Sequence, residues 1–479
     1  MGKLSCWRTI LTSFVILAAT TVAAPAQTFK TLVSFDGADG ANPEYAPLVQ
    51  GRDRNFYGTT RGVGGNGPGT VFKITAGGKL TTLADLGLEQ PYAGLVLATN
   101  GWFYGTTAQG GTYAWGTIFR MTSQGTLEPL YSFCAQQNCS DGVFPLFGLV
   151  QASNSNFYGT TPAAAAVGSP GTVFEFTPAD KFTTRHIFND GASSGPLIQA
   201  TDGNLYGVTG SGGAYGYGTV FEITAGGKFT ILHSFDGADG ATPSEGLVQA
   251  IDGNFYGTTQ QGGANNSCAY GCGTVFKMTP PPDSVLSTLY NFCSQANCTD
   301  GSDPISGLVQ ATDGNFYGTT AESGDRTTCG GYGCGTVFKL TRKSGLKTLH
   351  TFCSQTNCTD GAVPQAGLLQ ATNGTFYGVT TGGGTSGAGT VFSLSTGLGP
   401  FVTFVQRAAK LGHTAEILGQ GLTGTSKVSF NGTPAQHFAV NKSGTYLTVT
   451  VPTGATTGYV TVTTPKGTLK SNVPFRVIQ

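Results

Sequence analysis

The sequence predicts an all-β protein: a seven-bladed β-propeller closed by its N-terminal strand and followed by an immunoglobulin-like β-sandwich. The phrases Phe-Tyr-Gly-Thr-Thr and Gly-Thr-Val-Phe recur seven times with small variations, at steps of 47 (57 to 104) to 61 (256 to 317) residues. Glycine supplies 75 of 479 residues, which fits many short strands joined by tight turns. The tyrosines of the first phrase are Tyr57, Tyr104, Tyr158, Tyr206, Tyr256, Tyr317 and Tyr377.

Each repeat divides into four expected strands. In the fifth copy the first three cover Gly246–Ala250, Asn254–Thr259 and Gly273–Thr279, and Lys228–Phe235 in the preceding copy shows the fourth. The Asp252-Gly253 pair between the first two strands is a strong hairpin signal. Four antiparallel strands in about 50 residues match a propeller blade.

Adjacent aromatic residues support blades that are packed on both faces. Neighbouring side chains in a strand point to opposite faces, so Phe255 and Tyr256 cannot share one. Val275 and Phe276 repeat this arrangement on the third strand. A blade between two neighbouring blades would bury both faces.

The ends of the repeat region predict a closed ring. A lone fourth-type strand, Phe29–Phe35, precedes the first repeat, and the last repeat lacks a fourth strand after Phe392. The N-terminal strand can therefore complete the last blade and remove the open edges. An open solenoid is the alternative, but it would need polar caps that the sequence does not show.

The repeats resemble the GloVer-type tandem repeats of bacterial secreted proteins, which carry the same G-L-V-Q-A-x-D-G-N-F-Y-G-T-T and G-T-V-F-K segments. The resemblance covers residues 28 to 395. These motifs form the core, so the resemblance implies a secreted repeat protein but no activity. Several members of that family carry C-terminal anchoring signals, and none is evident here.

A second module begins after the propeller region, so the expected parts are a signal peptide (1–26), a propeller (27–396) and a C-terminal domain (397–479). The C-terminal domain resembles an IPT/TIG domain, an immunoglobulin-like sandwich. The matching segments are Leu418–Gly421, Val428–Gly432, Val451–Ala455 and Val473–Phe475. The usual aromatic after the first Gly-x-Gly is Leu422 here. The resemblance implies a partner surface, not a reaction.

The N-terminus predicts export. Lys3 and Arg8 precede the mostly apolar run Ile10–Ala24, and Ala24-Pro25-Ala26 is a small-x-small cleavage site. A membrane anchor is the alternative, but the run is shorter than the about 20 apolar residues that a span requires. We therefore expect a secreted or periplasmic monomer with no membrane span after cleavage.

Charge and motif content argue against several functions. Charged residues make up 10% of the chain, and 25 basic residues balance 25 acidic ones. Such a chain lacks the basic surface of a nucleic-acid binder. The sequence contains neither an H-E-x-x-H metal motif nor a Gly-x-Ser-x-Gly elbow in a strand-to-helix context. We expect no catalytic residues and no cofactor.

Ten cysteines follow the expected signal peptide, and their even number in an exported chain predicts five local disulfides. A zinc site built from two C-x4-C pairs is the alternative. The expected bridges are Cys134–Cys139, Cys268–Cys272, Cys293–Cys298, Cys329–Cys334 and Cys353–Cys358.

His186, His233 and His350 occupy one equivalent place on the fourth strand, and we interpret them as structural because nothing pairs them with a nucleophile. Asp-Gly-x-x-Pro loops follow that strand. Asp and Gly favour turns there, while calcium is the alternative where two carboxylates lie close. Those pairs are Asp36/Asp39, Asp236/Asp239 and Asp300/Asp303.

The long, variable loops predict the working face. Strand alternation places the second-to-third loop and the fourth-to-first loop on one side, and all five cysteine pairs lie in these loops. Aromatic side chains there suit stacking on sugar rings. We expect a binding or scaffold protein for an extracellular glycan or a surface protein, with a glycosidase or lyase, or a purely structural envelope protein, as alternatives. The candidate binding residues are Tyr113, Trp115, Tyr215, Tyr217, Tyr270 and Tyr332.

Overall fold

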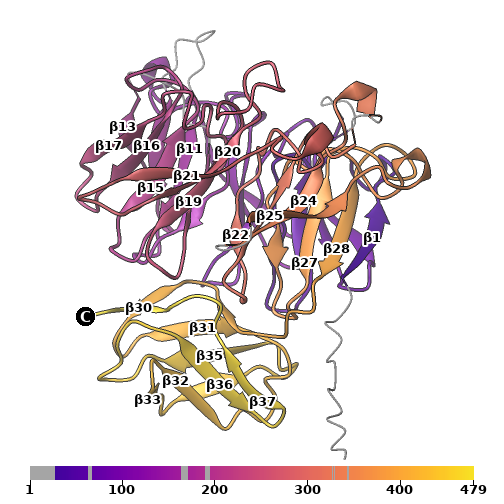
Figure 1. Ribbon diagram of the computed structural model, residues 1–479. Helices are drawn as coiled ribbons and strands as arrows, with labels where there is room; N and C mark the ends of the chain where they lie inside the picture. The colour runs from indigo at the N-terminus through magenta and orange to yellow at the C-terminus, as the bar shows by residue number, and fades with distance from the viewer. Residues whose placement is uncertain are drawn as a thin grey trace, which may run out of the picture.

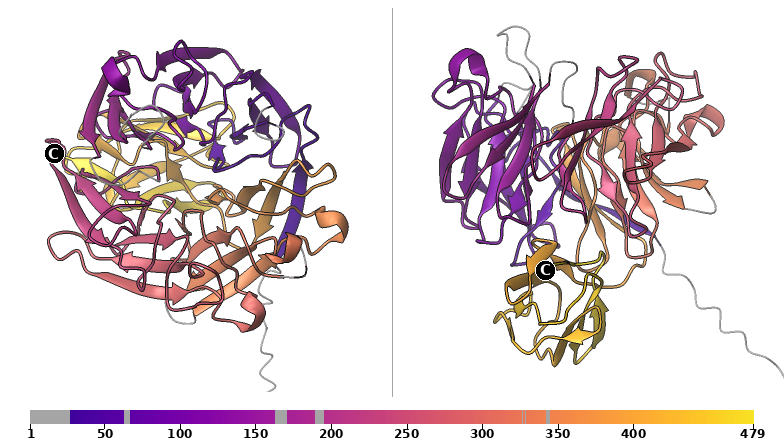
Figure 2. Two further views of the ribbon diagram at one scale, coloured as in Figure 1. Left: turned by 90° about the horizontal axis from the view of Figure 1, so that it is seen from above. Right: turned by 90° about the vertical axis from the view of Figure 1, so that its left-hand side faces the viewer.

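The computed structural model describes residues 27–62, 67–162, 171–188, 195–325, 327, 329–341 and 345–479. The expected signal peptide, residues 1–26, lies outside the described residues. Seven four-stranded antiparallel sheets form a ring, and a C-terminal β-sandwich lies across one face of it (Figures 1 and 2).

The first three blades are consecutive four-stranded meanders. Blade one contains β2 (Val49–Gln50), β3 (Phe56–Thr60), β4 (Thr70–Ile74) and β5 (Leu80–Asp85). Blade two contains β6 (Val96–Leu97), β7 (Phe103–Thr107), β8 (Thr117–Met121) and β9 (Leu127–Ser132). Blade three contains β10 (Val150–Gln151), β11 (Phe157–Thr161), β12 (Thr172–Phe176) and β13 (Phe182–Ile187).

The next three blades repeat this order. Blade four contains β14 (Ile198–Gln199), β15 (Leu205–Thr209), β16 (Thr219–Ile223) and β17 (Phe229–Ser234). Blade five contains β18 (Val248–Gln249), β19 (Phe255–Thr259), β20 (Thr274–Met278) and β21 (Leu286–Asn291). Blade six contains β22 (Val309–Gln310), β23 (Phe316–Thr320), β24 (Thr336–Thr341) and β25 (Gly345–Thr351).

The seventh blade confirms the predicted closure. It contains β26 (Leu369–Gln370), β27 (Phe376–Thr380) and β28 (Thr390–Ser395), and the N-terminal strand β1 (Thr28–Ser34) pairs antiparallel with β28. The ring therefore joins its two ends by backbone hydrogen bonds, and β1 completes the four-stranded sheet of this blade.

Aromatic contacts hold neighbouring blades together, as the adjacent Phe and Tyr predict. Each repeat tyrosine except Tyr158 packs against the repeat phenylalanine of the next blade; Tyr158 lacks this contact because blade four carries Leu205 there. The pair Tyr377 and Phe56, with ring centroids 4.1 Å apart, links blade seven to blade one. The other pairs are Tyr57–Phe103, Tyr104–Phe157, Tyr206–Phe255, Tyr256–Phe316 and Tyr317–Phe376.

One local expectation needs correction. The first strand is two residues long, not five, because the chain enters its turn at Ala250, whose carbonyl accepts a hydrogen bond from the Gly253 amide. The repeat glycine after each tyrosine makes room for an aromatic side chain. A Cβ on Gly257 would lie 2.6 Å from the ring of Phe276 on the adjacent strand.

The C-terminal domain is the expected two-sheet sandwich. One sheet orders β29 (Thr403–Phe404), β31 (Thr414–Leu418), β35 (Tyr446–Thr450) and β34 (Phe438–Val440). The other orders β33 (Thr433–Pro434), β32 (Lys427–Phe430), β36 (Val460–Thr464) and β37 (Gly467–Lys470), while β30 (Ala408–Lys410) pairs in parallel with β38 (Arg476–Ile478). Both sheets contribute to one buried cluster.

This domain docks on the tight-turn face of the propeller, at the turns that join first and second strands. Arg52 in the turn of blade one forms an ion pair with Glu416, and its carbonyl accepts a hydrogen bond from Thr445. Gln406 and Arg476 donate hydrogen bonds to the carbonyls of Ala152 and Asp202 in the turns of blades three and four. The C-terminal domain thus covers one end of the ring.

Candidate functional site

The long loops lie on the opposite face, away from the C-terminal domain (Figure 1). All five disulfides form between the cysteines that the sequence pairs, and all lie in these loops. Three of the bridges span short 3-10 turns after the fourth strand: η2 (Gln137–Cys139), η4 (Ala296–Cys298) and η6 (Thr356–Cys358). The fold therefore leaves one face open, and disulfides brace its loops.

Most of the repeated aspartates form hydrogen bonds within their own loops and to the adjacent fourth strand. Asp300 is buried and accepts hydrogen bonds from the Tyr290 hydroxyl and the Ser294 amide. His350 contacts the buried Asp360 in the same way, with 3.1 Å between His Nε2 and the carboxylate. These histidines and tyrosines therefore occupy one structural position, in line with the structural interpretation.

The other histidines of the fourth strand and the other paired aspartates also contact neighbouring residues. His233 Nε2 lies 2.7 Å from the Asp239 carboxylate. His186 stacks on Phe229, and burial lowers its pKa. Within the turns, Asp36 and Asp236 accept hydrogen bonds from the amides of Asp39 and Asp239. In the part of the chain that the structure describes, the groups of three or more clustered metal-ligating side chains consist of cysteines, not carboxylates.

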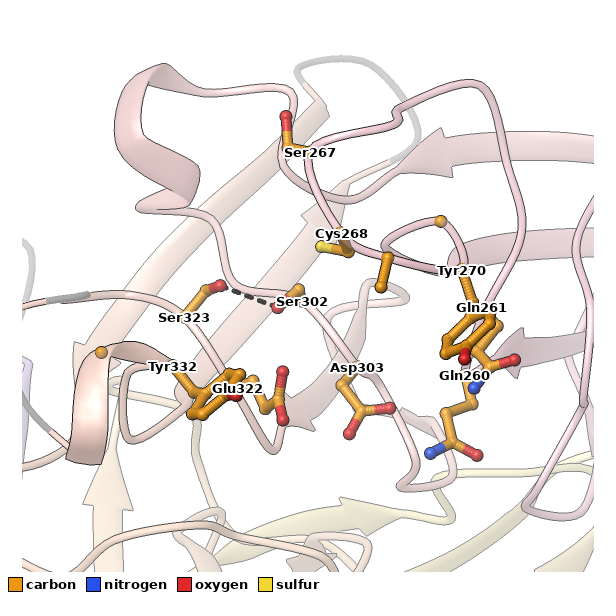
Figure 3. Close-up of a pocket in the computed structure, with 13 residues that line it drawn as sticks. Gln260, Gln261, Ser267, Cys268, Tyr270, Ser302, Asp303, Glu322, Ser323 and Tyr332 are labelled. Carbon is orange, nitrogen blue, oxygen red and sulfur yellow. Dashed lines mark hydrogen bonds between the residues drawn. The ribbon is translucent and has the colours of Figure 1, made fainter.

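A pocket of about 420 Å³ opens between the loops of blades five and six. Tyr270 and Tyr332, which are 76% and 69% exposed, both line it. Figure 3 shows Asp303 and Glu322 between these two tyrosines, with Gln260 and Gln261 on the Tyr270 side. The pocket therefore combines two aromatic faces with carboxylate, amide and hydroxyl groups.

Local backbone contacts hold the pocket in shape. Tyr270 lies inside the loop closed by Cys268–Cys272, and Tyr332 lies inside the loop closed by Cys329–Cys334. The Asp303 amide donates to the Cys272 carbonyl, and the Asp303 carbonyl accepts from Ala321. The Ser302 and Ser323 hydroxyls are 2.7 Å apart (Figure 3).

The pocket perturbs the ionisation of Asp303. Burial raises the pKa of this carboxyl to about 7, and the nearby negative charge of Glu322 adds to the increase. A hydrogen bond from Gln260 acts in the opposite direction. Near neutral pH, Asp303 can therefore hold a proton that it could donate to a ligand.

Further acidic groups lie in the segments that lead into the first strands of the blades. Glu245 is 8% exposed, and burial raises its pKa to about 8. The neighbouring Ser244 hydroxyl donates to the Ile305 carbonyl, which links this segment to the pocket loop. Burial raises the pKa of Tyr45, on blade one, to about 12, and Glu44, Asp303 and Glu245 contribute to the increase.

The other four predicted binding residues lie elsewhere on the same face. Tyr113, Tyr215, Tyr270 and Tyr332 each stand three residues before the glycine of Gly-Thr-Val-Phe or its variant. Tyr113 and Tyr215 belong to blades two and four and do not line the pocket. Trp115 packs edge-on against Phe144, and Tyr217 lies beside Gly237. The structure thus brings together two of the six predicted residues.

Sequence reasoning did not identify the acidic pair of this pocket. Asp303 precedes the proline of the Asp-Gly-x-x-Pro loop and has a positive φ. A signal was present, because the other blades place uncharged residues there, as with Asn42, Thr242 and Val363. Glu322 likewise stands where blade five has Gln261.

No helix within the described residues is long and apolar enough to cross a membrane. The five disulfides indicate an oxidising, extracytoplasmic setting.

Solved structures share this fold at low sequence identity. A streptogramin B lyase matches with a TM-score of 0.52 and 11% identity over 77% of this chain and 97% of the lyase. A fungal alcohol oxidase of the AA5 family, solved with copper, matches with a TM-score of 0.51 and 12% identity over 94% of this chain and 99% of the oxidase. Virginiamycin B lyase from Staphylococcus aureus matches with a TM-score of 0.49 and 11% identity over 77% of this chain and 99% of the lyase. At these identities the first two matches, whose TM-scores are above 0.5, show the fold alone.

Together, these observations define a repeat-built β-propeller with one face open. No curated protein matches the chain in sequence. The Gloeobacter/Verrucomicrobia repeat model matches residues 18–134, 85–269 and 264–472. The chain belongs to the Gloeobacter/Verrucomicrobia repeat family.

Proposed function

We propose that this protein is a secreted or periplasmic binding module that recognises an extracellular glycan in the pocket between blades five and six. The observation that carries the proposal is the placement of Tyr270 and Tyr332, two exposed aromatic rings, on one pocket lined with amides and carboxylates. Sugar rings present apolar C–H faces and hydroxyl groups, so they can stack on such rings and hydrogen-bond between them.

Two further features support this location. The C-terminal domain already covers the tight-turn face, so the long-loop face is the one left open. Disulfides close the loops that carry both tyrosines, which lowers the ordering cost of binding.

Glycan-array binding tests the proposal. We expect Tyr270→Ala and Tyr332→Ala each to weaken binding by about 1 kcal/mol, roughly five-fold, through loss of stacking, without lowering Tm. Tyr215→Ala is the matched control, because Tyr215 is 63% exposed at the equivalent place of blade four and lies outside the pocket. Equal losses in all three variants, or none, would contradict the proposal.

Glycoside hydrolysis is a second candidate, favoured by two carboxyl groups in one pocket, of which Asp303 has a pKa of about 7. Asp303 would act as the general acid and Glu322 as the second carboxylate of such a reaction. Asp303→Asn would then abolish turnover of a bound glycan while leaving its binding in place. Binding without turnover by the wild-type protein would exclude this candidate.

The C-terminal domain fits the role of a spacer or partner module. Its two-sheet sandwich and its Gly-x-Gly and Val-Pro segments support an IPT/TIG-like assignment. Its docking on the propeller would orient the open face away from whatever this domain contacts.

A further inference from the structure

The charged groups of the pocket between blades five and six are of one sign. Among the described residues that line it, Asp303 and Glu322 are acidic, and none is lysine, arginine or histidine. A sugar that carries its own carboxylate or sulfate would be repelled there, because like charges brought together at an interface cost binding energy. The pocket therefore favours a neutral or cationic sugar over an acidic one.

The two tyrosine rings add a second preference for positive charge. Figure 3 shows Asp303 and Glu322 between Tyr270 and Tyr332. The face of an aromatic ring carries partial negative charge and attracts an ammonium group. A protonated amine between these rings can also donate hydrogen bonds to the two carboxyl groups, and such charge-assisted bonds are the strong ones. The rings and the carboxyl groups thus select the same kind of ligand group.

The backbone holds these four side chains in place from adjacent blades. The carbonyls of Tyr270 and Tyr332 each accept a hydrogen bond from an amide nearer the start of their own loop, at 2.8 and 2.7 Å. Reciprocal backbone hydrogen bonds between Ser302 and Glu322 join the loop that follows blade five to blade six. The binding groups are therefore positioned before a ligand arrives, which lowers the ordering cost of binding.

We propose that the pocket binds a glycan with free amino groups, such as an oligomer of glucosamine, and that it holds a protonated amine between the two tyrosine rings and the two carboxyl groups. This inference rests on the proposed function, because it names the class of glycan for the same pocket. It adds that charge, and not ring stacking alone, selects the ligand.

The chain contains an internal comparison for this site. At the adjacent boundary, between blades four and five, Thr242 and Gln261 stand where the pocket has Asp303 and Glu322. Blade one has Asn42 at the first of these places, with a φ of 51° against 58° for Asp303. The double variant Asp303→Asn/Glu322→Gln therefore copies side chains that the fold already accepts at equivalent places, and it removes both acidic groups with little change in size.

Calorimetric titration of the full, oxidised chain tests the proposal with oligomers of glucosamine, N-acetylglucosamine and glucose that share one length and linkage. At pH 7 and low salt, we expect the glucosamine oligomer to bind about ten-fold more tightly than either neutral oligomer, because its amine forms charge-assisted hydrogen bonds. High salt should weaken the binding of the glucosamine oligomer alone, because salt screens charges.

Two variants locate the effect. Asp303→Asn/Glu322→Gln should abolish the preference for the glucosamine oligomer and leave the affinity for the neutral oligomers unchanged. Glu89→Gln is the matched control, because Glu89 is an acidic residue in a loop of the same face, accepts a hydrogen bond from the Gly111 amide and does not line the pocket. This control should keep the preference.

Equal affinity of the wild-type chain for all three oligomers would overturn this inference and leave the proposed glycan site in place. Binding of none of the three would overturn it too, while the glycan array decides the proposed function separately. A preference that persists in the double variant would show that the amine binds elsewhere. Tighter binding of a lysine oligomer than of the glucosamine oligomer would assign the pocket to a cationic peptide and contradict both proposals. The wild-type comparisons decide the question even where a variant fails to fold.

Discussion

At the scale of single residues, the same aromatic side chain serves two purposes according to its place in the repeat. Tyr317, on the second strand, is fully buried and packs against Phe376 of the next blade with ring centroids 4.3 Å apart. Tyr332, in the following loop, is exposed at the pocket. Substitutions at these two positions should therefore affect different properties.

Tyr317→Ala should reduce the free energy of unfolding by about 3 to 5 kcal/mol, because it leaves a cavity between blades six and seven. Chemical denaturation of the purified protein measures this change. Tyr317→Phe is the matched control, since it keeps the ring and removes only the hydroxyl, which donates a hydrogen bond to Asp313, at a cost of about 1 kcal/mol. Similar values for the two variants would show that the hydroxyl, not the packing, carries the stability.

Glu245 should make the protein less stable as pH rises. Its pKa is about 8 in the folded state against 4.5 ordinarily, so the folded state retains a proton that the unfolded state has lost. The loss of folding stability caused by Glu245 is absent below about pH 4.5, grows between about pH 4.5 and pH 8, and is complete above about pH 8. Glu245→Gln should therefore stabilise the protein at pH 8.5 by on the order of a few kcal/mol, and much less at pH 5.

Melting curves across this pH range measure that effect. Asp283→Asn, at an exposed position, is the control and should change Tm little at any pH. A Glu245→Gln variant whose stability parallels that of the wild type at every pH would contradict the buried, proton-holding carboxyl.

At the scale of elements, β1 closes the ring. It pairs with β28, and its Phe29 stacks on Phe392 of that strand with ring centroids 5.4 Å apart. Deletion of residues 28–34 should lower Tm markedly and promote aggregation, because the edge of β28 becomes unpaired. Light scattering and calorimetry test this, with a chain that begins at Gln27 as the control. Equal stability of the two chains would contradict closure by β1.

The sequence predicted these elements better than it predicted the pocket. Strand alternation, the Asp-Gly turns and the Phe-Tyr pairs are local signals that recur, with variations, from blade to blade, so the blades and their closure followed from them. The shortness of β18 could not be predicted in this way, since the adjacent turn determines it. The juxtaposition of Asp303 and Glu322 depends on the packing of one blade's loop against the next, which no local pattern encodes.

At the scale of the whole molecule, the two domains give the propeller two unlike ends. The C-terminal domain contacts the turns of blades one, three and four through Arg52, Ala152 and Asp202. The opposite face carries every disulfide and the pocket of Tyr270 and Tyr332. The arrangement favours ligand binding at the end that the C-terminal domain does not cover.

Hydrogen exchange with and without a glycan selected on the array tests this central claim most directly. Binding should protect the amides of residues 260–271 and 329–335, which form the pocket loops, and leave the turns at residues 52–54, 152–155 and 202–204 unchanged. Protection confined to those turns or to the C-terminal domain would show that the ligand binds at the other end of the ring, and would contradict the account.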